Sequence, residues 1–268
     1  MSPHLKRWVT ALIAVPVLFG INAYGGKASF AVLIILASLA GMYEYNRMAF
    51  GKGLSVEKGV TMASALLILL TAVTGEAKVL FALVAFSVMA VLMLNLLRIR
   101  EKGLDMAPAG RALLGILYIP VLMSHFILIR GTSSGALWIF FILVLAFAGD
   151  IAAFYVGRRL GKRKLLPEVS PGKTVEGMIG LMVGSVVGCL LFRQWFFPEL
   201  AAAHTVILGL VGSVAGQLGD LSESALKRAA GVKDSGTMLP GHGGILDRLD
   251  CLMFITPFVY YYQEFVIR

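Results

Sequence analysis

The sequence predicts an all-α integral membrane protein, and three observations support that prediction. Of the 268 residues, 58% are hydrophobic and only 15% are charged, whereas about a quarter of the residues in a soluble domain are charged. The mean hydropathy is +0.85, and apolar runs near the length of a membrane span recur along the whole chain. These runs are continuous rather than alternating, which favours helices over the strands of a barrel. We therefore expect a polytopic helical bundle.

The apolar runs predict about nine transmembrane helices in a single domain covering residues 1–268. The first run follows Lys6-Arg7 and lacks a good small-x-small cleavage site, so we interpret it as an uncleaved span rather than a signal peptide. The N-terminal helices occupy about 8–129, and a C-terminal half at about 135–268 carries the polar motifs. The expected helices are 8–24, 28–49, 60–75, 77–97, 110–129, 135–156, 178–197, 203–219 and 249–267.

The basic residues predict how the helices are oriented. With the N-terminus in the cytoplasm, 19 of the 24 Lys and Arg residues fall on the cytoplasmic side, as the positive-inside rule requires. Two connections on that side, 157–177 and 220–250, are long, basic and rich in Gly and Pro. We therefore expect a polar pocket that faces the cytoplasm.

The formal net charge of +9 indicates cytoplasmic anchoring and attraction for anionic lipid or nucleotide, rather than a nucleic-acid partner. The two cysteines, Cys189 and Cys251, lie inside apolar runs and are interpreted as packing residues.

Carboxylates gather at the cytoplasmic ends of the predicted spans. Asp150 closes the sixth span, and Asp220 closes the eighth. Two pairs of acids are three residues apart, Asp220 with Glu223 and Asp247 with Asp250. If these stretches are helical, the members of each pair share one face of the helix. A carboxylate at membrane depth is unfavourable by about 2.5–3.5 kcal/mol, and oxygen ligands without a His/Cys set favour Mg²⁺. The alternative is that these acids cap helix ends and form ion pairs with Lys227, Arg228 or Arg248.

Glycine and lysine residues in the two long connections are typical of phosphate binding. Lys173-Thr174 follows Ser170-Pro171-Gly172, and residues 241–244 read Gly-His-Gly-Gly. Glycines allow backbone N–H groups to converge on a phosphate, and lysines add charge there. His242 is the one histidine in polar surroundings, which makes it a candidate for phosphate contact. The cations at 158–164 are interpreted as membrane anchors.

Carboxylates and phosphate-binding loops in one cytoplasmic pocket suit Mg²⁺-assisted phosphoryl or nucleotidyl transfer to a lipid. No Cys–His or Ser–His–Asp arrangement indicates a covalent intermediate.

The stretch SALKRAAGVKDSGTMLPGHGGILDRLD, residues 224–250, resembles the signature of the phosphatidate cytidylyltransferases, also called CDP-diacylglycerol synthases. SPGKTVEG at 170–177 and GDIAAFYVGR at 149–158 are similar to two further motifs of that family. Gly172 stands where the family commonly has Lys, and the second motif departs from the family at Ile151, Ala152 and Phe154. The N-terminal half resembles the family only loosely, around Glu44–Met48.

The resemblance implies the reaction CTP + phosphatidate → CDP-diacylglycerol + pyrophosphate, with Mg²⁺ and a possible second cation such as K⁺. It makes the C-terminal half catalytic and implies metal ligation by Asp220, Asp247 and Asp250. The catalytic candidates are Asp150, Lys173, Glu223, Lys227 and Arg248. Of these, Asp150 or Glu223 is expected to be a further metal ligand. The candidates for substrate and phosphate binding are Ser170, Thr174, Glu176, Ser224, Arg228, Lys233, Asp234, His242, Gly243 and Gly244.

Two alternatives stay open at this stage. One is a related lipid enzyme, such as a CTP-dependent polyprenol kinase or an archaeol-type cytidylyltransferase, and the other is an ion-coupled transporter. The expected location is a bacterial inner membrane with the site facing the cytoplasm. Small residues in GMIGLMVGSVVG, 177–188, suit close helix packing, either in a homodimer or within one chain.

Overall fold

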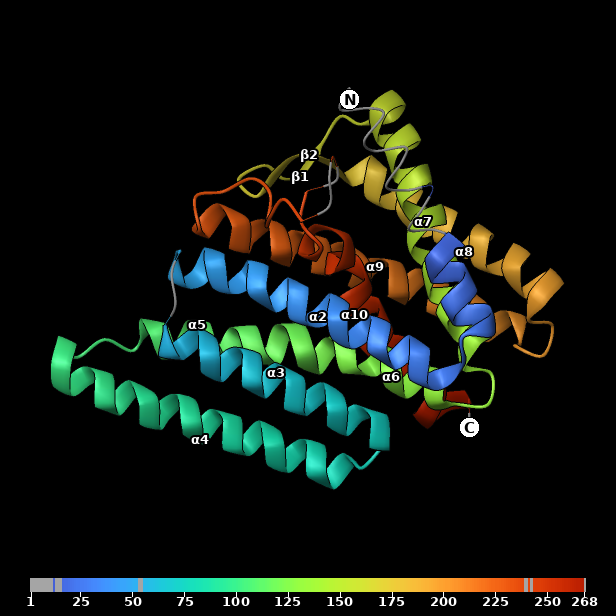
Figure 1. Ribbon diagram of the computed structural model, residues 1–268. Coiled ribbons are helices and arrows are strands. Elements are labelled where there is room, and N and C mark those ends of the chain that lie inside the picture. The colour runs from blue at the N-terminus through green and yellow to red at the C-terminus, as the bar shows by residue number, and fades with distance from the viewer. Residues whose placement is uncertain (1–11, 13–15, 53–54, 239–240, 242, 268) are drawn as a thin grey trace. The chain divides into compact units, whose positions relative to one another are not determined.

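The structure is a computed structural model that describes residues 12, 16–52, 55–238, 241 and 243–267 (Figure 1). Within the described residues, seven helices are long and apolar enough to cross a membrane, which confirms the all-α polytopic class. The count of nine is not confirmed. The start of the first predicted span lies outside the described residues, and the ninth corresponds to α10 (Leu246–Tyr262), only 17 residues long, continued by the π-helix η2 (Gln263–Ile267).

The chain forms two compact units. Unit 1 comprises Met1–Gly131 and Asp234–Asp247, and unit 2 comprises Thr132–Lys233 and Arg248–Arg268. The family-like signature at 224–250 is thus divided, because its central loop belongs to the unit built from the N-terminal helices.

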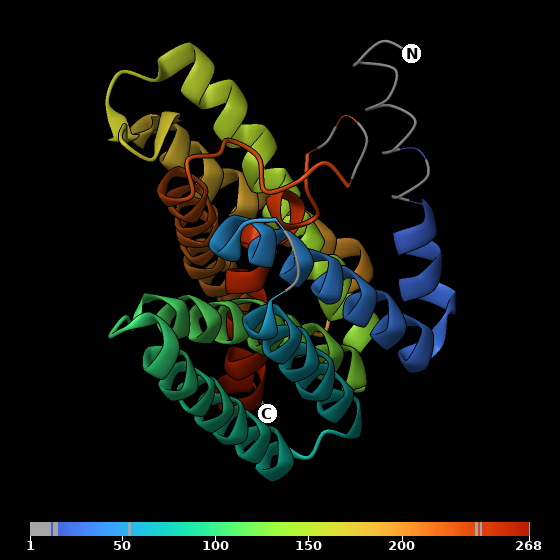
Figure 2. The same cartoon turned by 60° about the vertical axis from the view of Figure 1, so that its left-hand side comes forward.

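Unit 1 is a helical layer in which α2 packs on α3 and α6, and α3 also packs on α4 and α5 (Figures 1 and 2). Its core includes the fully buried side chains of Met42, Ile68 and Leu69, and the loop contributes Leu246, which is also fully buried. The helices of this unit are α2 (Gly26–Phe50), α3 (Val56–Thr74), α4 (Ala77–Lys102), α5 (Ala107–Ile116) and α6 (Leu122–Gly131).

The fifth predicted span is interrupted in the middle. A short π-helical segment, η1 (Leu117–Val121), joins α5 to α6 and contains Pro120. Proline has no N–H to donate and its ring crowds the preceding turn, so the regular helical ladder gives way there.

Unit 2 is built on α7 (Gly135–Leu160), α8 (Val175–Phe196) and α9 (Ala202–Ala229), with the part of α10 from Arg248 onward. In α8, Gly180, Gly184 and Gly188 face α7 so closely that a Cβ on any of them would clash with it. The small-residue stripe therefore packs the two helices within one chain, as one of the two interpretations expected.

Two expectations about this unit are wrong. A β-hairpin of β1 (Lys164–Leu166) and β2 (Ser170–Thr174) lies in the connection where only loop was expected. In addition, α9 continues ten residues beyond the predicted end at 219, so Asp220 lies inside a helix rather than closing it. Asp150 lies inside α7, as the predicted range 135–156 already implied. Hydropathy marks where apolar sequence stops, whereas the hydrogen-bonded helix continues into polar sequence.

Candidate active site

A cavity of about 490 Å³ lies among α7, β2, α8 and α9 of unit 2. Its apolar wall includes Phe154, Met178 and Leu181, so charged groups meet a hydrophobic surface in one cavity. The polar and charged side chains that line it are Asp150, Arg158, Lys173, Thr174, Gln217 and Asp220. A space of this kind can accept a molecule with both a phosphate and an apolar part.

The Lys173–Asp220 ion pair is the main electrostatic feature of this cavity. The Lys173 ammonium contacts Asp220 Oδ2, and the Ser224 hydroxyl donates to Asp220 Oδ1 at 3.3 Å. Asp150 interacts electrostatically with both members of the pair. Because the side chains of Lys173 and Asp220 keep 22% and 34% of their exposure, the pair contributes little to stability and its members can exchange partners.

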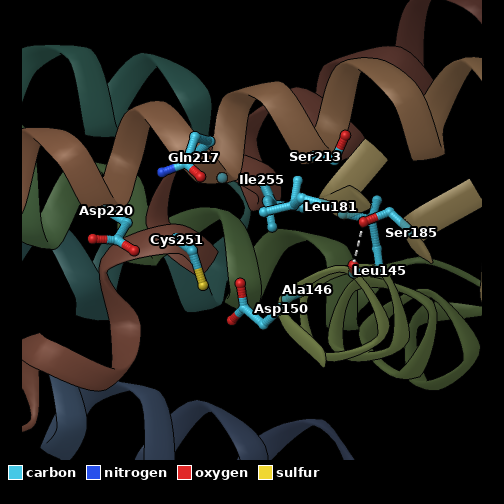
Figure 3. Close-up of a pocket in the computed structure, with 11 residues that line it drawn as sticks. Leu145, Ala146, Asp150, Leu181, Ser185, Ser213, Gln217, Asp220, Cys251 and Ile255 are labelled. Atoms are coloured by element: carbon cyan, nitrogen blue, oxygen red, sulfur yellow. Dashed lines mark hydrogen bonds between the residues drawn. The ribbon is translucent and has the colours of Figure 1, made fainter. Parts of the chain in front are cut away.

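A narrower polar space continues from the same carboxylates. Figure 3 shows Asp150, Asp220 and Cys251 at one end of it, while Ser185 and Ser213 lie at the other. The Ser185 hydroxyl donates to the Leu145 carbonyl at 2.8 Å, and Cys251 carries a free thiol. Polar groups therefore extend from the carboxylates in among the apolar helices.

Gln217 lines both spaces, and the sequence analysis did not identify it. It is 8% exposed, and within the described residues its Nε2 has no hydrogen-bond partner. The available signal was a polar side chain in an apolar run, one helical turn before Asp220. An amide donor left without a partner in a cavity is suited to a ligand acceptor.

Asp250 belongs to this group through α10. It interacts electrostatically with Asp220, Lys173 and Lys227. Close approach of the two helices is possible because Gly219 has no side chain where the Asp250 carbonyl and Phe254 contact α9.

Glu223 and Lys227 form an ion pair one turn apart on α9. The Glu223 side chain is fully buried and that of Lys227 is 12% exposed. This is the kind of pairing that the alternative interpretation of the acids expected. Their catalytic role stays a prediction.

Several predicted phosphate-binding residues organise the hairpin. The Thr174 hydroxyl caps α8 by accepting from Gly177 N–H at 3.0 Å, and Arg228 Nε donates to the Val169 carbonyl at 3.3 Å. The Glu176 carboxylate accepts from the N–H groups of Lys162 and Arg163, and Ser170 begins β2. Together these contacts hold Lys173 at the cavity.

The central loop of the signature, 234–247, is organised by Asp247 within unit 1. Asp247 Oδ2 accepts from Ser235 N–H at 3.0 Å, from the Ser235 hydroxyl at 3.0 Å and from Gly244 N–H at 2.8 Å. Gly243 adopts φ +84°, a conformation that favours glycine. His242 lies outside the described residues. Of the remaining candidates, the exposed ones are Lys233, Asp234 and Arg248.

The predicted metal ligands fall in different units: Asp220 and Asp250 in unit 2, and Asp247 in unit 1. Within the described part of the chain, no three His, Cys, Asp or Glu side chains are arranged to hold a metal ion by themselves. The ligand set stays a prediction.

Comparison with known proteins assigns the family. Residues 5–266 match the model of the Cytidylyltransferase family. A phosphatidate cytidylyltransferase of Bacillus subtilis is 36% identical over 263 residues, which cover 96% of each chain. Proteins of the same name from Synechocystis and Staphylococcus epidermidis are 34% and 33% identical, over 96% and 94% of this chain and 95% of each relative. The chain therefore belongs to the cytidylyltransferase family and is a nucleotidyltransferase.

Proposed function

We propose that this member of the cytidylyltransferase family transfers the CMP unit of CTP to phosphatidate, forming CDP-diacylglycerol and pyrophosphate. The observation that carries the proposal is the cavity of unit 2, where the exchangeable Lys173–Asp220 pair adjoins an apolar wall. A lipid with a phosphate headgroup needs a charged partner for the phosphate and an apolar surface for its acyl chains. The names of the relatives support phosphatidate as the acceptor.

The reaction requires little proton chemistry from the protein. A phosphate monoester has a second pKa of about 6, so the lipid phosphate is substantially ionised near neutral pH. One of its oxygens forms a bond to the α-phosphorus of CTP while the bond between that phosphorus and the α–β bridging oxygen breaks. The leaving electron pair goes to pyrophosphate. No covalent enzyme intermediate is needed.

The protein then acts by positioning and by charge neutralisation. Lys173 is held at the cavity by the hairpin, and it can leave Asp220 to pair with a substrate phosphate. Gln217 Nε2 provides a neutral donor beside it. Phe154 and Met178 contribute the apolar surface on which an acyl-bearing substrate can lie.

The donor set of unit 2 fits a Mg²⁺ ion. Asp150, Asp220 and Asp250 offer carboxylate oxygens, and Mg²⁺ is bound in many proteins by one or two carboxylates together with substrate phosphates and water. Asp220 and Asp250, both members of the predicted ligand set, would hold the ion together with substrate phosphates and water, since no three of the described side chains are arranged to do so by themselves. When bound, it would neutralise negative charge on the phosphates.

We also propose that the active site faces the cytoplasm of a bacterium from its inner membrane. The seven apolar helices and the bacterial relatives support this placement, and so do the 19 Lys and Arg residues that the predicted nine-span topology puts on one side of the membrane. CTP is a cytosolic nucleotide, so the orientation and the donor substrate agree.

One experiment separates the candidate functions. Purified full-length protein in lipid vesicles is incubated with phosphatidate and Mg²⁺, using CTP labelled either in the cytosine ring or in the γ-phosphate. We expect ring label in the extracted lipid, and its loss when EDTA removes the metal. Only γ-label in the lipid would indicate a kinase. Label in neither form, with cation uptake by the vesicles, would favour a transporter.

A further inference from the structure

A buried carboxylate in the N-terminal unit has its two partners 191 and 202 residues away along the chain. Glu44, in the C-terminal third of α2, is only 2% exposed. Its Oε2 accepts from the Ser235 hydroxyl at 3.1 Å and from Leu246 N–H at 3.0 Å. Burial of a carboxylate is unfavourable unless such donors compensate for lost water. The loop 234–247 therefore provides both donors to Glu44 Oε2.

The loop is also shaped around this carboxylate. Gly236 and Gly244 lie against the Glu44 carboxyl group so closely that a Cβ on either would clash with it. Leu246 is fully buried in the same unit, and its side chain lies beside Gly41, one turn before Glu44 on α2. The loop thus contacts α2 around Glu44 through its glycine backbone, through the Leu246 side chain and through two hydrogen bonds.

Glu44 is connected to Asp247 through shared partners. The Ser235 hydroxyl that reaches Glu44 also lies 3.0 Å from Asp247 Oδ2, and Gly244 N–H donates to the same Asp247 oxygen. Leu246 is the first residue of α10, so Glu44 accepts from one of the N–H groups that the start of a helix leaves without an internal partner. Glu44 therefore influences both the loop and the point where Asp247 enters α10.

We propose that Glu44 is a positioning residue that anchors the loop 234–247 and thereby sets the orientation of Asp247. Its 2% exposure excludes direct contact with a substrate in this conformation. The expected effect on catalysis rests on the proposed cytidylyltransferase activity, whereas the anchoring itself does not.

The first test measures anchoring without using activity. Glu44→Gln keeps the size of the side chain but removes its negative charge, which weakens the acceptor for the Ser235 hydroxyl and the Leu246 N–H. In the full-length protein in detergent, we expect hydrogen exchange at the amides of Leu246 and Gly244 to become roughly tenfold faster or more. Amides of α3 should stay within about twofold of the parent protein. Glu57→Gln removes a carboxylate of the same unit that pairs with Arg98, and it should leave loop exchange unchanged.

The second test links anchoring to catalysis. With CTP and phosphatidate, Glu44→Gln should lower kcat by roughly tenfold or more while KM for CTP changes by less than about threefold. The reason is that the substitution misplaces Asp247, a predicted metal ligand, and removes no contact to CTP. Ser235→Ala, which deletes one partner of Glu44, should show the same pattern more weakly and serves if Glu44→Gln does not fold.

These outcomes can contradict the inference separately from the proposed function. Unchanged loop exchange in Glu44→Gln overturns the anchor, and so does an equal rise in α3, which would mark a general loss of stability. For Ser235→Ala, unchanged exchange at Gly244 and Leu246 has the same consequence. If the parent protein lacks cytidylyltransferase activity but the loop responds to Glu44→Gln, the anchor stands and the proposed function fails.

Discussion

Two pairs of carboxylates, one pair in each unit, have different surroundings. In unit 1, Glu44 and Asp247 accept from backbone N–H groups and from Ser235. These contacts hold together the described parts of the loop, residues 234–238 and 243–247. In unit 2, Asp150 and Asp220 line a cavity, and the partner of Asp220 is a lysine side chain that keeps part of its exposure. The first arrangement is suited to holding a conformation, and the second to exchanging a partner for a ligand.

This difference separates acids that sequence spacing alone presents as equivalent. A carboxylate held by backbone donors is costly to change, because those donors lose their acceptor in the folded state. A carboxylate paired with a partly exposed lysine contributes little to folding. Substitutions in the two units should therefore affect stability and activity in different proportions.

The largest expected effect is on activity, in unit 2. Asp220→Asn should reduce kcat by about 100-fold or more, because it removes a negative charge from the lining of the cavity, while Tm changes by only a few degrees. The measurement is CDP-diacylglycerol formation alongside thermal unfolding. Asp105→Asn, which alters an exposed acid at the start of α5 in unit 1, is the matched control and should keep full activity. An active Asp220→Asn protein would contradict the assignment.

Two lysines of unit 2 sharpen the comparison further. Lys173→Met should raise KM for CTP by about tenfold at nearly constant Tm, since its pair with Asp220 is partly exposed. Lys227→Met should instead destabilise the protein by about 3 kcal/mol, because it removes an ammonium paired with a fully buried carboxylate. Steady-state kinetics and thermal unfolding of both variants check this. Equal stability losses would show that the two pairs do not differ.

The smallest effect concerns packing in unit 2. Gly184→Ala introduces a Cβ that clashes with Ala152 of α7, so it should destabilise by about 1–3 kcal/mol and lower Tm by several degrees. Gly59→Ala is the matched control, because a Cβ at this α3 position contacts nothing within 4 Å. That variant should be neutral or slightly stabilised. A Gly184→Ala protein with the parent Tm would contradict the close packing of α8 on α7.

Some structural features were not predictable from local pattern. The hairpin at 164–174 has one strand of three residues and another that contains Pro and Gly, and neither has the alternation typical of a strand. Gln217 lies in an apolar run, and the sequence does not show that its amide group lines a cavity. That cavity exists only because other segments of unit 2 pack beside this helix. Glu44 carried even less signal, because its partners follow about 190 to 200 residues later.

The sequence by itself determined the membrane class, the helical backbone and the family. A bilayer requires long apolar helices with internal hydrogen bonds, and such a helix can be identified from one continuous run of apolar residues. Only the tertiary structure decided which acids line a cavity, which pair with lysine and which anchor a loop. The reason is physical: a carboxylate's role depends on the donors that surround it, and for Glu44 and Asp220 most of these donors come from segments distant in the chain.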